Sequence, residues 1–309
     1  MSNTTSHTIL IVDNFLNTAP FVSGLSSGPH GIELKGDTLF ACSGGSIKGY
    51  LTNGAVPVFD LDLGAIFLNG LTTDGAYLYT TDFSTNKIYK VDPFNGSFTT
   101  LVGSTGYTPN GIVYDPTEDR LVVVSWGANA TIHAVDPVLG TNDLLYTTPL
   151  TNIDGITIDC LGNFIVSSWS PDQLTKYDPS FGMAGVDLGA VGLNNPADIG
   201  YDPVHHIVMA PNAGNNTVSF VQLTYCNVGI PGNASSAQVR SYPIPTDGEL
   251  MLEVPGVSWT PYEVMDMSGR KVHEGRWDEG HPIDLHDLAT GAYLLELPRI
   301  GVRERVMVR

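Results

Sequence analysis

The sequence of 309 residues has little of what membrane-spanning, helical and nucleic-acid-binding proteins need. No run of apolar residues approaches the length of about eighteen that a membrane-spanning helix requires. Helical periodicity is absent over any useful length, which argues against a mainly helical fold. Residues 1–14 contain no basic stretch followed by an apolar run, so no signal peptide is visible in this chain.

Positive charge is scarce. Residues 1–231 carry six Lys/Arg against twenty Asp/Glu, a net −14, and residues 232–309 carry eight against twelve, a net −4; together they give the −18 of the whole chain. A surface this acidic repels phosphate backbones, so no nucleic-acid partner is expected. It suits a soluble exported protein, and the alternative interpretation is an affinity for cations.

The signatures of several common enzymes are missing as well. No GxSxG, HExxH or P-loop motif occurs, so a serine hydrolase, a zinc protease and a nucleotidase have no support. The sequence instead contains 34 glycines and 20 prolines among short apolar stretches. That mixture is typical of many short strands joined by tight turns.

A repeat of about forty residues organises the first two thirds of the chain. Five segments share a pattern around one glycine, and we call the residue before that position the ring residue of its repeat. The ring residues are His30, Asn69, Asn110, Asp154 and Ala197, at intervals of 39, 41, 44 and 43 residues. Four short strands per unit of this length predict an all-β fold, a β-propeller of five or six four-stranded blades.

The N-terminus predicts how the propeller closes. Residues 8–22 repeat the pattern of residues 87–102, so the chain begins with the third and fourth strands of a blade. Our working model completes that blade with two strands from the last repeat, near residues 197–210, which closes a five-bladed ring and removes exposed sheet edges. The alternative is a six-bladed parent that has lost half a blade together with its signal peptide.

The pattern stops after Leu223, and the composition changes. We predict a propeller domain over residues 1–223, a linker over residues 224–238 with small, Gly and Pro residues, and a small C-terminal β-sandwich over residues 239–309. The three cysteines are Cys42, Cys160 and Cys226, an odd number without a CxxC pair. They are expected to be packed thiols and not a disulfide framework or a zinc site. The alternative is that Cys42 and Cys160 lie in neighbouring blades.

Residues 239–309 resemble the type A C-terminal sorting domain of the type IX secretion system. The motifs are Tyr242-Pro243-x-Pro245-Thr246-x-Gly248, Met267-Ser268-Gly269-Arg270, Leu288-Ala289-x-Gly291-x-Tyr293 and the basic end at Arg309. The resemblance implies export through the periplasm to the outside or the outer cell surface, with the secretion machinery and a sortase as partners of the tail. The alternative is an accessory sandwich domain that binds a ligand.

A second resemblance concerns the propeller. PNGI at 109–112 and DGITIDCLGN at 154–163 are similar to motifs of the gluconolactonase and senescence-marker-protein family of calcium-dependent lactonases. The resemblance implies that Asn69, Asn110 and Asp154 hold a divalent cation and that Asp154 is also catalytic. The remaining ligand of that family, a glutamate, has no counterpart here. No other cofactor is indicated.

The same motif also occurs in NHL-type propellers, where Asn and Asp cap turns, so ring residues with a purely structural role are the alternative. In the ligand-binding interpretation, the glycine shared by the repeats lets the backbone turn sharply and lets a ligand approach closely. Trp126 and Trp169 end the second strands of adjacent blades, where they stack on a sugar or an aromatic ligand or else cover their own blades. Together with His30 they are the predicted ligand-binding residues.

Two functions follow from these patterns. The favoured one is a ligand-binding or adhesion module at the cell surface, which takes a small molecule or a glycan at the mouth of the propeller. The alternative is a calcium-dependent lactonase, and the incomplete set of ligands weighs against it. The propeller fold itself does not decide between them. The adjacent His205 and His206 are expected in a turn, pointing to opposite faces, without a shared metal.

Overall fold

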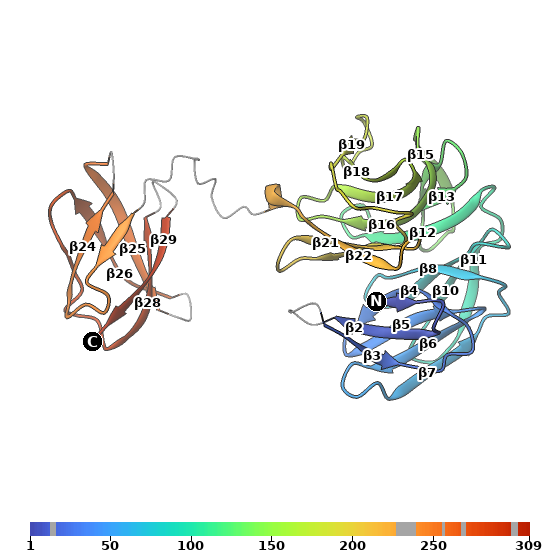
Figure 1. Cartoon of the computed structure of the whole chain (residues 1–309), viewed down its shortest axis with the longest axis horizontal. Helices are drawn as coiled ribbons and strands as arrows, with labels where there is room; N and C mark the ends of the chain where they lie inside the picture. The colour runs from blue at the N-terminus through green and yellow to red at the C-terminus, as the bar shows by residue number, and fades with distance from the viewer. Residues whose placement is uncertain (13–16, 227–238, 255–256, 267–269, 298–301) are drawn as a thin grey trace. The chain divides into compact units, whose positions relative to one another are not determined.

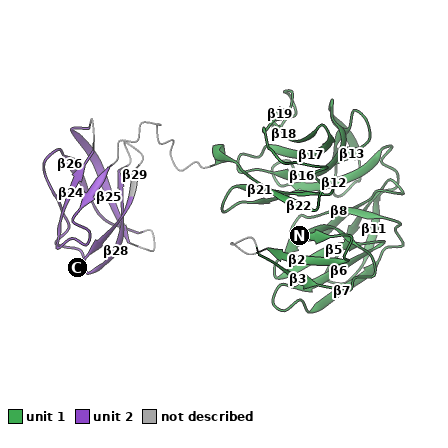
Figure 2. Cartoon of the chain, viewed as in Figure 1, with its two compact units in different colours: residues 1–226 green, residues 227–309 purple. Residues whose placement is uncertain are grey.

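The structure is a computed structural model that describes residues 1–12, 17–226, 239–254, 257–266, 270–297 and 302–309. It divides the chain into two compact units, Met1–Cys226 and Asn227–Arg309 (Figure 2). The described residues form β-strands and one short 3-10 helix, η1 (Thr224–Cys226). No helix among them is long and apolar enough to cross a membrane.

Six antiparallel sheets build the first unit, and we number them as blades 1 to 6 (Figure 1). Blade 1 has β1 (Ser2–Asn3), β2 (Thr8–Val12) and β3 (Thr18–Val22). Blade 2 has β4 (Pro29–Lys35), β5 (Thr38–Ser43), β6 (Ser46–Leu51) and β7 (Pro57–Asp62). Blade 3 has β8 (Leu68–Thr73), β9 (Leu78–Asp82), β10 (Lys87–Val91) and β11 (Phe98–Val102).

The other three blades follow the same plan in chain order. Blade 4 has β12 (Thr108–Asp115), β13 (Arg120–Trp126), β14 (Thr131–Val135) and β15 (Asn142–Thr147). Blade 5 has β16 (Thr151–Ile158), β17 (Phe164–Ser170), β18 (Asp172–Tyr177) and β19 (Val186–Asp187). Blade 6 has β20 (Gly200–Asp202), β21 (Ile207–Asn212) and β22 (Thr217–Gln222). The fold is therefore the predicted β-propeller.

The hydrophobic core lies between neighbouring blades. A middle strand such as β13 is covered on both faces, which is why it carries four consecutive aliphatic residues, 121–124, that are all fully buried. One core cluster joins Tyr79 and Ile88 of blade 3 to Leu121 and Val123 of blade 4. Packing of this kind makes each blade depend on the next one.

The terminal blades each lack one strand position. The innermost strands β4, β8, β12, β16 and β20 contact one another in this order, and second strands such as β13 also contact the next innermost strand. Because β1 contacts β4, we assign β1 to the second position, so blade 1 holds a second, third and fourth strand among the described residues. Blade 6 holds a first, second and third strand.

The predicted third and fourth strands, β2 and β3, are confirmed, but the chain begins one strand earlier, with β1, and the five-bladed closure is wrong. β2 pairs with β3 along one edge and with β1 over Thr8 and Ile9 on the other, and among the described residues no strand of the last repeat pairs with it. The first and last sheets stay separate, which gives six sheets instead of five.

A disulfide joins Cys160 to Cys226, and the prediction of three packed thiols is wrong for this pair. After β22 the chain turns back as η1 and packs on blade 5, where the Tyr225 hydroxyl donates to Asp159 Oδ2 at 2.8 Å. This return brings Cys226 to the turn between β16 and β17, a proximity that a separation of 66 residues hides in the sequence. Cys42 is a buried free thiol, as expected.

The second unit is a two-sheet β-sandwich. One sheet has the order β23 (Arg240–Tyr242), β24 (Glu249–Glu253), β27 (Ile283–Asp284), and the other has the order β26 (Lys271–Asp278), β25 (Trp259–Asp266), β28 (Gly291–Leu297), β29 (Val302–Val308). Apolar side chains alternate along these strands and meet in one core, with Leu250, Val264, Trp277 and Leu295 among its buried members.

The predicted sorting motifs meet at the C-terminus. Thr246 is fully buried; its N–H donates to the Met307 carbonyl at 2.8 Å, and the Arg309 N–H donates to the Thr246 carbonyl at 3.0 Å. The Arg309 guanidinium also pairs with the Asp247 carboxylate, Nε to Oδ1 at 2.6 Å. The motif at residues 267–269 lies outside the described residues.

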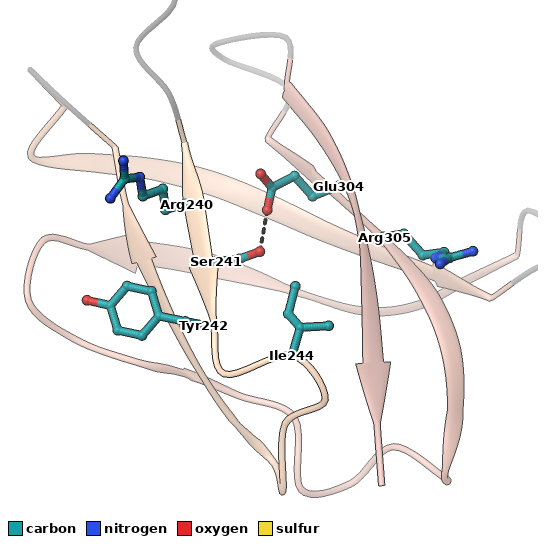
Figure 3. Close-up of a pocket in the computed structure, with 6 residues that line it drawn as sticks. All are labelled: Arg240, Ser241, Tyr242, Ile244, Glu304 and Arg305. Atoms are coloured by element: carbon teal, nitrogen blue, oxygen red, sulfur yellow. Dashed lines mark hydrogen bonds between the residues drawn. The ribbon is translucent and has the colours of Figure 1, made fainter.

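A shallow groove runs between the edge strands β23 and β29 of this unit (Figure 3). The Ser241 hydroxyl donates to the Glu304 carboxylate across it. Its lining consists of Arg240, Ser241, Tyr242, Ile244, Glu304 and Arg305. The groove belongs to the second unit, whereas all of the ring residues belong to the first.

Candidate functional site

Each ring residue before a glycine lies at a β-bulge. The pairing of the innermost strand with the second strand shifts register between Pro29 and Ile32 in blade 2 and between Leu68 and Leu71 in blade 3. The same shift recurs in blade 4 at residues 109–112 and in blade 5 at residues 153–156. A bulge takes two residues out of the regular ladder and re-aims their side chains. The repeat therefore places four ring residues in equivalent, non-ladder positions.

The shared glycines are needed because the next innermost strand passes very close to them. A Cβ atom on Gly70 would lie 2.5 Å from the Asn110 carbonyl oxygen, and one on Gly111 would lie 2.6 Å from that of Asp154. Both glycines have ordinary φ angles, so space and not conformation requires them. The prediction that these glycines admit a ligand and turn the backbone is wrong, because the neighbouring blade occupies that space.

A hydroxyl on the second strand bridges adjacent blades at this point. In blade 3, the Gly70 N–H donates to Thr81 Oγ1 at 2.9 Å, and this hydroxyl donates to the Asn110 carbonyl at 2.7 Å. In blade 5, Ser167 Oγ accepts from the Gly155 N–H at 2.8 Å and donates to the Ala197 carbonyl at 2.7 Å. These bonds satisfy backbone groups that the bulge releases from the ladder.

The carboxamide ring residues bond from one blade to the next. Asn69 Nδ2 donates to Asn110 Oδ1, and Asn110 Nδ2 donates to the Ile153 carbonyl at 3.2 Å. Asn110 is only 1% exposed, whereas Asn69 is partly exposed. The structure thus brings these two predicted metal ligands into contact, and the side-chain oxygen of Asn110 is already engaged by Asn69.

Asp198 is a residue of this site that the sequence pattern missed. Ala197 holds the ring position of blade 6, and Asp198 stands where the other repeats have glycine, since Gly155 packs against the Asp198 Cα atom. In the other blades a side chain there would strike the next innermost strand. Blade 1 has no innermost strand among the described residues, so an aspartate is tolerated at this one place.

Three carboxyl groups share the centre of the propeller. Burial, and then repulsion by Asp198, raise the pKa of the Asp154 carboxyl to about 8. Burial raises the pKa of Asp198 to about 7, and burial followed by repulsion from Asp198 raises that of Glu33 to about 7. No basic side chain contributes to any of these shifts. Burial also lowers the pKa of His30, which keeps the imidazole neutral at pH 7.

An arc of aromatic rings follows the mouth of the propeller, the end at which the innermost strands begin. Ring centroids lie 4.6 Å apart for His30 and Phe67, and 5.5 Å apart for Phe67 and Phe83. They lie 5.9 Å apart for Phe83 and Trp126, and 4.9 Å apart for Trp126 and Trp169. All five side chains are partly exposed. The contact between Trp126 and Trp169 confirms that both flank one rim.

The arc ends beside the carboxyl groups. The Nε1–H of Trp169 is buried and has no hydrogen bond of regular geometry, yet it lies close enough to the Asp154 carboxyl to oppose the rise of its pKa. His30, at the other end of the arc, is on the same strand as Glu33. The ring contacts therefore link His30, Trp126 and Trp169, which are predicted to bind a ligand, and Trp169 lies beside Asp154, which is predicted to be catalytic.

Asp82 holds the two loops that carry Phe67 and Phe83. Its buried carboxylate accepts from the Phe67 N–H and from the Ser84 N–H, at 3.2 and 3.1 Å. Burial raises the pKa of Asp82, but these and further hydrogen bonds, including one from the Thr85 hydroxyl, outweigh it and lower the pKa overall. The aromatic arc is thus anchored by an ionised side chain.

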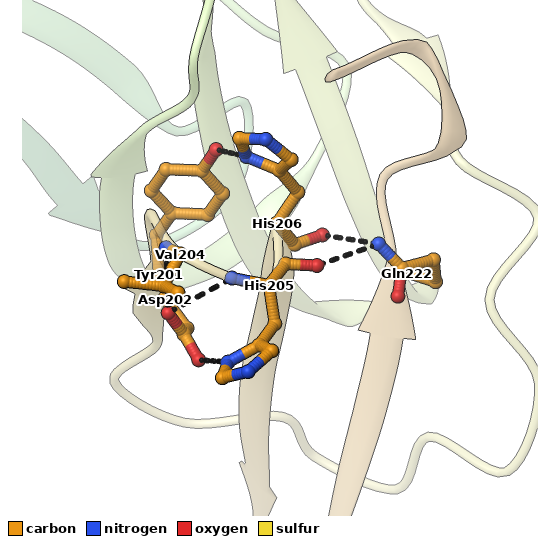
Figure 4. A network of polar contacts seen from close by, with 6 residues as sticks. All are labelled: Tyr201, Asp202, Val204, His205, His206 and Gln222. Carbon is orange, nitrogen blue, oxygen red and sulfur yellow. Dashed lines mark hydrogen bonds and ion pairs between the residues drawn. The ribbon is translucent and has the colours of Figure 1, made fainter. Parts of the chain in front are cut away.

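The histidine pair lies in the turn between β20 and β21 (Figure 4). His205 Nδ1 contacts Asp202 Oδ2 and His206 Nδ1 contacts the Tyr201 hydroxyl, each at 2.7 Å, so the two rings point apart as expected. The Gln222 amide donates to both of their carbonyl oxygens. Asp202 also accepts from the Val204 N–H at 2.8 Å, as a turn-forming aspartate does.

The described residues offer an incomplete cage for a divalent cation at the mouth. Calcium takes about six to eight oxygen ligands, whereas the Asn110 oxygen is engaged by Asn69. Among the described His, Cys, Asp and Glu side chains, the one group of three close enough to share an ion is Cys160, His206 and Cys226, and a disulfide joins two of these. The carboxyl groups of the mouth form no such group.

Comparison with known proteins identifies the tail. Residues 240–301 match the family model of the secretion system C-terminal sorting domain. The match confirms the predicted sorting domain, so the chain is a β-propeller protein exported by the type IX secretion system toward the cell surface. Its tail therefore interacts with that secretion machinery. No curated protein matches the chain in sequence.

Solved structures with a similar fold are distant in sequence. A chain of a nidogen–laminin complex aligns with a TM-score of 0.63 at 17% identity, over 73% of this chain and 89% of that chain. A catalytically inactive virginiamycin B lyase from Staphylococcus aureus, crystallised with quinupristin, aligns with a TM-score of 0.52 at 12% identity, over 80% and 85% of the two chains. A Bacteroides thetaiotaomicron protein of unknown function aligns with a TM-score of 0.54 at 14% identity, over 69% and 66%. These likenesses show the propeller fold alone.

Proposed function

We propose that this exported propeller is a binding module that takes a small molecule or a glycan at its mouth. The observation that carries the proposal is the arc from His30 to Trp169, five partly exposed rings in mutual contact along one rim. Aromatic rings in such positions offer large apolar surface at a small cost in side-chain entropy. The buried Asp82 carboxylate holds the loops that carry Phe67 and Phe83, so this part of the surface is preorganised.

Ligand binding is tested by a screen of glycans and small molecules against the purified full-length chain, with tryptophan fluorescence as the readout. We expect Trp126→Ala and Trp169→Ala each to weaken binding of any ligand found by about tenfold or more, the effect of losing a central aromatic contact. Trp259→Ala, in the sandwich unit, is the matched control and should leave binding unchanged. Ligands that bind the Trp126 and Trp169 variants as well as the wild type would refute the mouth as the site.

A second candidate function is hydrolysis of lactones with a divalent cation such as calcium. It is favoured by the Asp154 carboxyl, whose pKa of about 8 suits a proton acceptor that works near neutral pH. Calcium titration by calorimetry, together with lactone hydrolysis by the wild type and by Asp154→Asn, separates the two functions. Calcium binding and turnover that both depend on Asp154 would establish the hydrolase in place of the binding module.

The fate of the tail is proposed as cleavage by a sortase at the cell surface, between the propeller and the sandwich. We expect removal of residues 239–309 to retain the propeller in the periplasm, because the sorting domain is the part that the secretion machinery recognises. Cell fractionation and surface labelling provide the measurement, and Arg276→Ala, an exposed substitution in the intact sandwich, is the control. Normal surface display of the truncated chain would contradict this assignment.

A further inference from the structure

The mouth of the propeller joins aromatic rings to carboxyl groups without any basic side chain among them. The first unit has only six Lys/Arg. Lys48 and Arg120 pair with Asp60 and Asp115 on the blades. Lys90 donates to a backbone carbonyl and Lys176 lies over the ring of Tyr225, while Lys35 and Lys87 make no contribution to the pKa of the three carboxyls.

No basic side chain of the protein therefore favours the ionised form of Asp154, and a bound cation would favour it by lowering the pKa of the carboxyl. The side chain is 8% exposed, its nearest acidic neighbour is Asp198, and among the described contacts only the indole of Trp169 favours its ionised form. A buried carboxylate is normally paired or hydrogen-bonded, because burial of an isolated charge is costly. Positive charge supplied by a ligand would satisfy Asp154 and Asp198 together.

A second observation points to a ligand at the same place. The Nε1–H of Trp169 is buried and has no regular hydrogen-bond partner, although it lies beside Asp154. Of the three described side chains with a buried unpaired polar atom, Trp169 is the one at the mouth. Its N–H is a donor, so it would bond to an acceptor of the ligand such as a hydroxyl, while the cationic group faces the carboxyls. The arc that leads to Trp169 is the apolar half of the same site.

The chemistry of these groups favours an organic cation over a bare metal ion. Rings of Trp and Phe attract an ammonium group through their π faces and pack against its carbon substituents, whereas a divalent metal needs a cage of converging oxygens. Such a cage is incomplete among the described side chains, because the Asn110 oxygen is taken and the three carboxyls do not gather within ligand distance.

We infer that the ligand of the mouth is an organic cation, an ammonium group on a carbon framework, held by Asp154 and Asp198 and covered by the rings of Trp126 and Trp169. This inference rests on the proposed binding function and gives the ligand its class. Phe67 and Phe83 extend the apolar surface toward His30, so the ligand carries an apolar part as well as the charge.

The test uses the full-length chain and two probes of equal shape, choline and the neutral 3,3-dimethylbutan-1-ol, in titration calorimetry. We expect choline to bind and the neutral probe to bind at least about tenfold more weakly. Asp154→Asn and Asp198→Asn should each weaken choline binding by about tenfold or more and raise the melting temperature, since they remove repulsion. Asp60→Asn, at an exposed carboxylate of β7, is the matched control and should not affect binding.

The outcomes separate the inference from the function on which it rests. Equal binding of both probes, or binding of a neutral ligand that depends on Trp169 without binding of choline, would overturn the cationic class but leave the binding module. Calcium binding that depends on Asp154 and excludes choline would identify a metal site instead. Failure of choline, of the neutral probe and of every screened ligand would overturn both proposals.

Discussion

At the scale of single residues, the centre of the propeller buries carboxyl groups in surroundings that disfavour their ionised form. Asp154 and Asp198 lie on neighbouring innermost segments, and burial raises the pKa of both carboxyls, to about 8 and about 7. Both values lie above that of an aspartate in an unfolded chain. The folded state therefore binds protons more readily than the unfolded state, and these groups stabilise the fold most when they are protonated.

This linkage predicts how stability depends on pH. Because the folded pKa values exceed the unfolded ones, the stabilisation is complete below about pH 4 and is lost as the pH rises through about 7 to 8. The free energy of unfolding of Asp154→Asn should exceed that of the wild type by more at about pH 8 than at about pH 5. We expect this difference to grow by at least about 1.4 kcal/mol, the equivalent of one pKa unit. Urea unfolding at the two pH values measures this difference, and parallel curves for both proteins would contradict it.

At the scale of structural elements, the bulge of each innermost strand sets the distance between blades. Glycine follows the ring residue in blades 2 to 5 because the next strand leaves no room for a Cβ atom. The bulge and the hydroxyl bridge of Thr81 or Ser167 make the close approach possible without unsatisfied backbone groups. Blade-to-blade packing is thus encoded in a few positions of each repeat.

Substitution of one such glycine tests this account. We expect Gly111→Ala to destabilise the propeller by about 1–3 kcal/mol, the usual cost of overpacking, because the new Cβ atom meets the Asp154 carbonyl oxygen. Gly103→Ala is the matched control, since Gly103 has open space around it and no positive φ. Urea unfolding compares the two variants, and equal stabilities would mean that the innermost strands can move apart at little cost.

The sequence repeat made much of this fold predictable. Contacts between residues far apart in the chain could not be predicted, because they leave no trace in the repeat pattern. A period of about forty residues sufficed for the propeller and for the equivalence of Asn69, Asn110 and Asp154, because each blade reuses one local pattern. Asp198 was missed because its repeat replaces the glycine that marks the others. Phe67 was missed because it follows no shared spacing. Phe83 stands two residues after Thr81, as Trp169 stands two residues after Ser167, so this equivalence is the signal that could have found it.

At the scale of the whole molecule, the last part of the propeller is fastened by a covalent bond and not by exchange of a strand with the N-terminus. Cys226 ends the first unit, and its disulfide to Cys160 ties that end to blade 5. Tyr225 adds a hydrogen bond to Asp159 and a contact with the Lys176 ammonium. The segment that follows the three described strands of blade 6 is thereby tied to blade 5.

We expect loss of this disulfide to destabilise the propeller by about 2–4 kcal/mol, because the bond closes a long loop in the unfolded chain. Cys160→Ala with Cys226→Ala should lower the melting temperature to that of the reduced wild type. Reductant should not change the double variant, which serves as the control. An unchanged melting temperature in the double variant would contradict this role.

Native protein should show no thiol reactive to alkylation, since burial raises the pKa of Cys42 to about 12.

The position of this disulfide also orders events during export. Cys226 is the final residue of the first unit, and its partner lies 66 residues earlier. Protein disulfides form in oxidising compartments such as the periplasm, and this one cannot close until the entire propeller sequence has arrived there. On the proposed route through the periplasm, a closed bond would report that the whole first unit has crossed the inner membrane. The sandwich that follows in the sequence is the sorting domain that the type IX secretion machinery recognises. The disulfide therefore lies at the boundary between the folded propeller domain and its sorting domain.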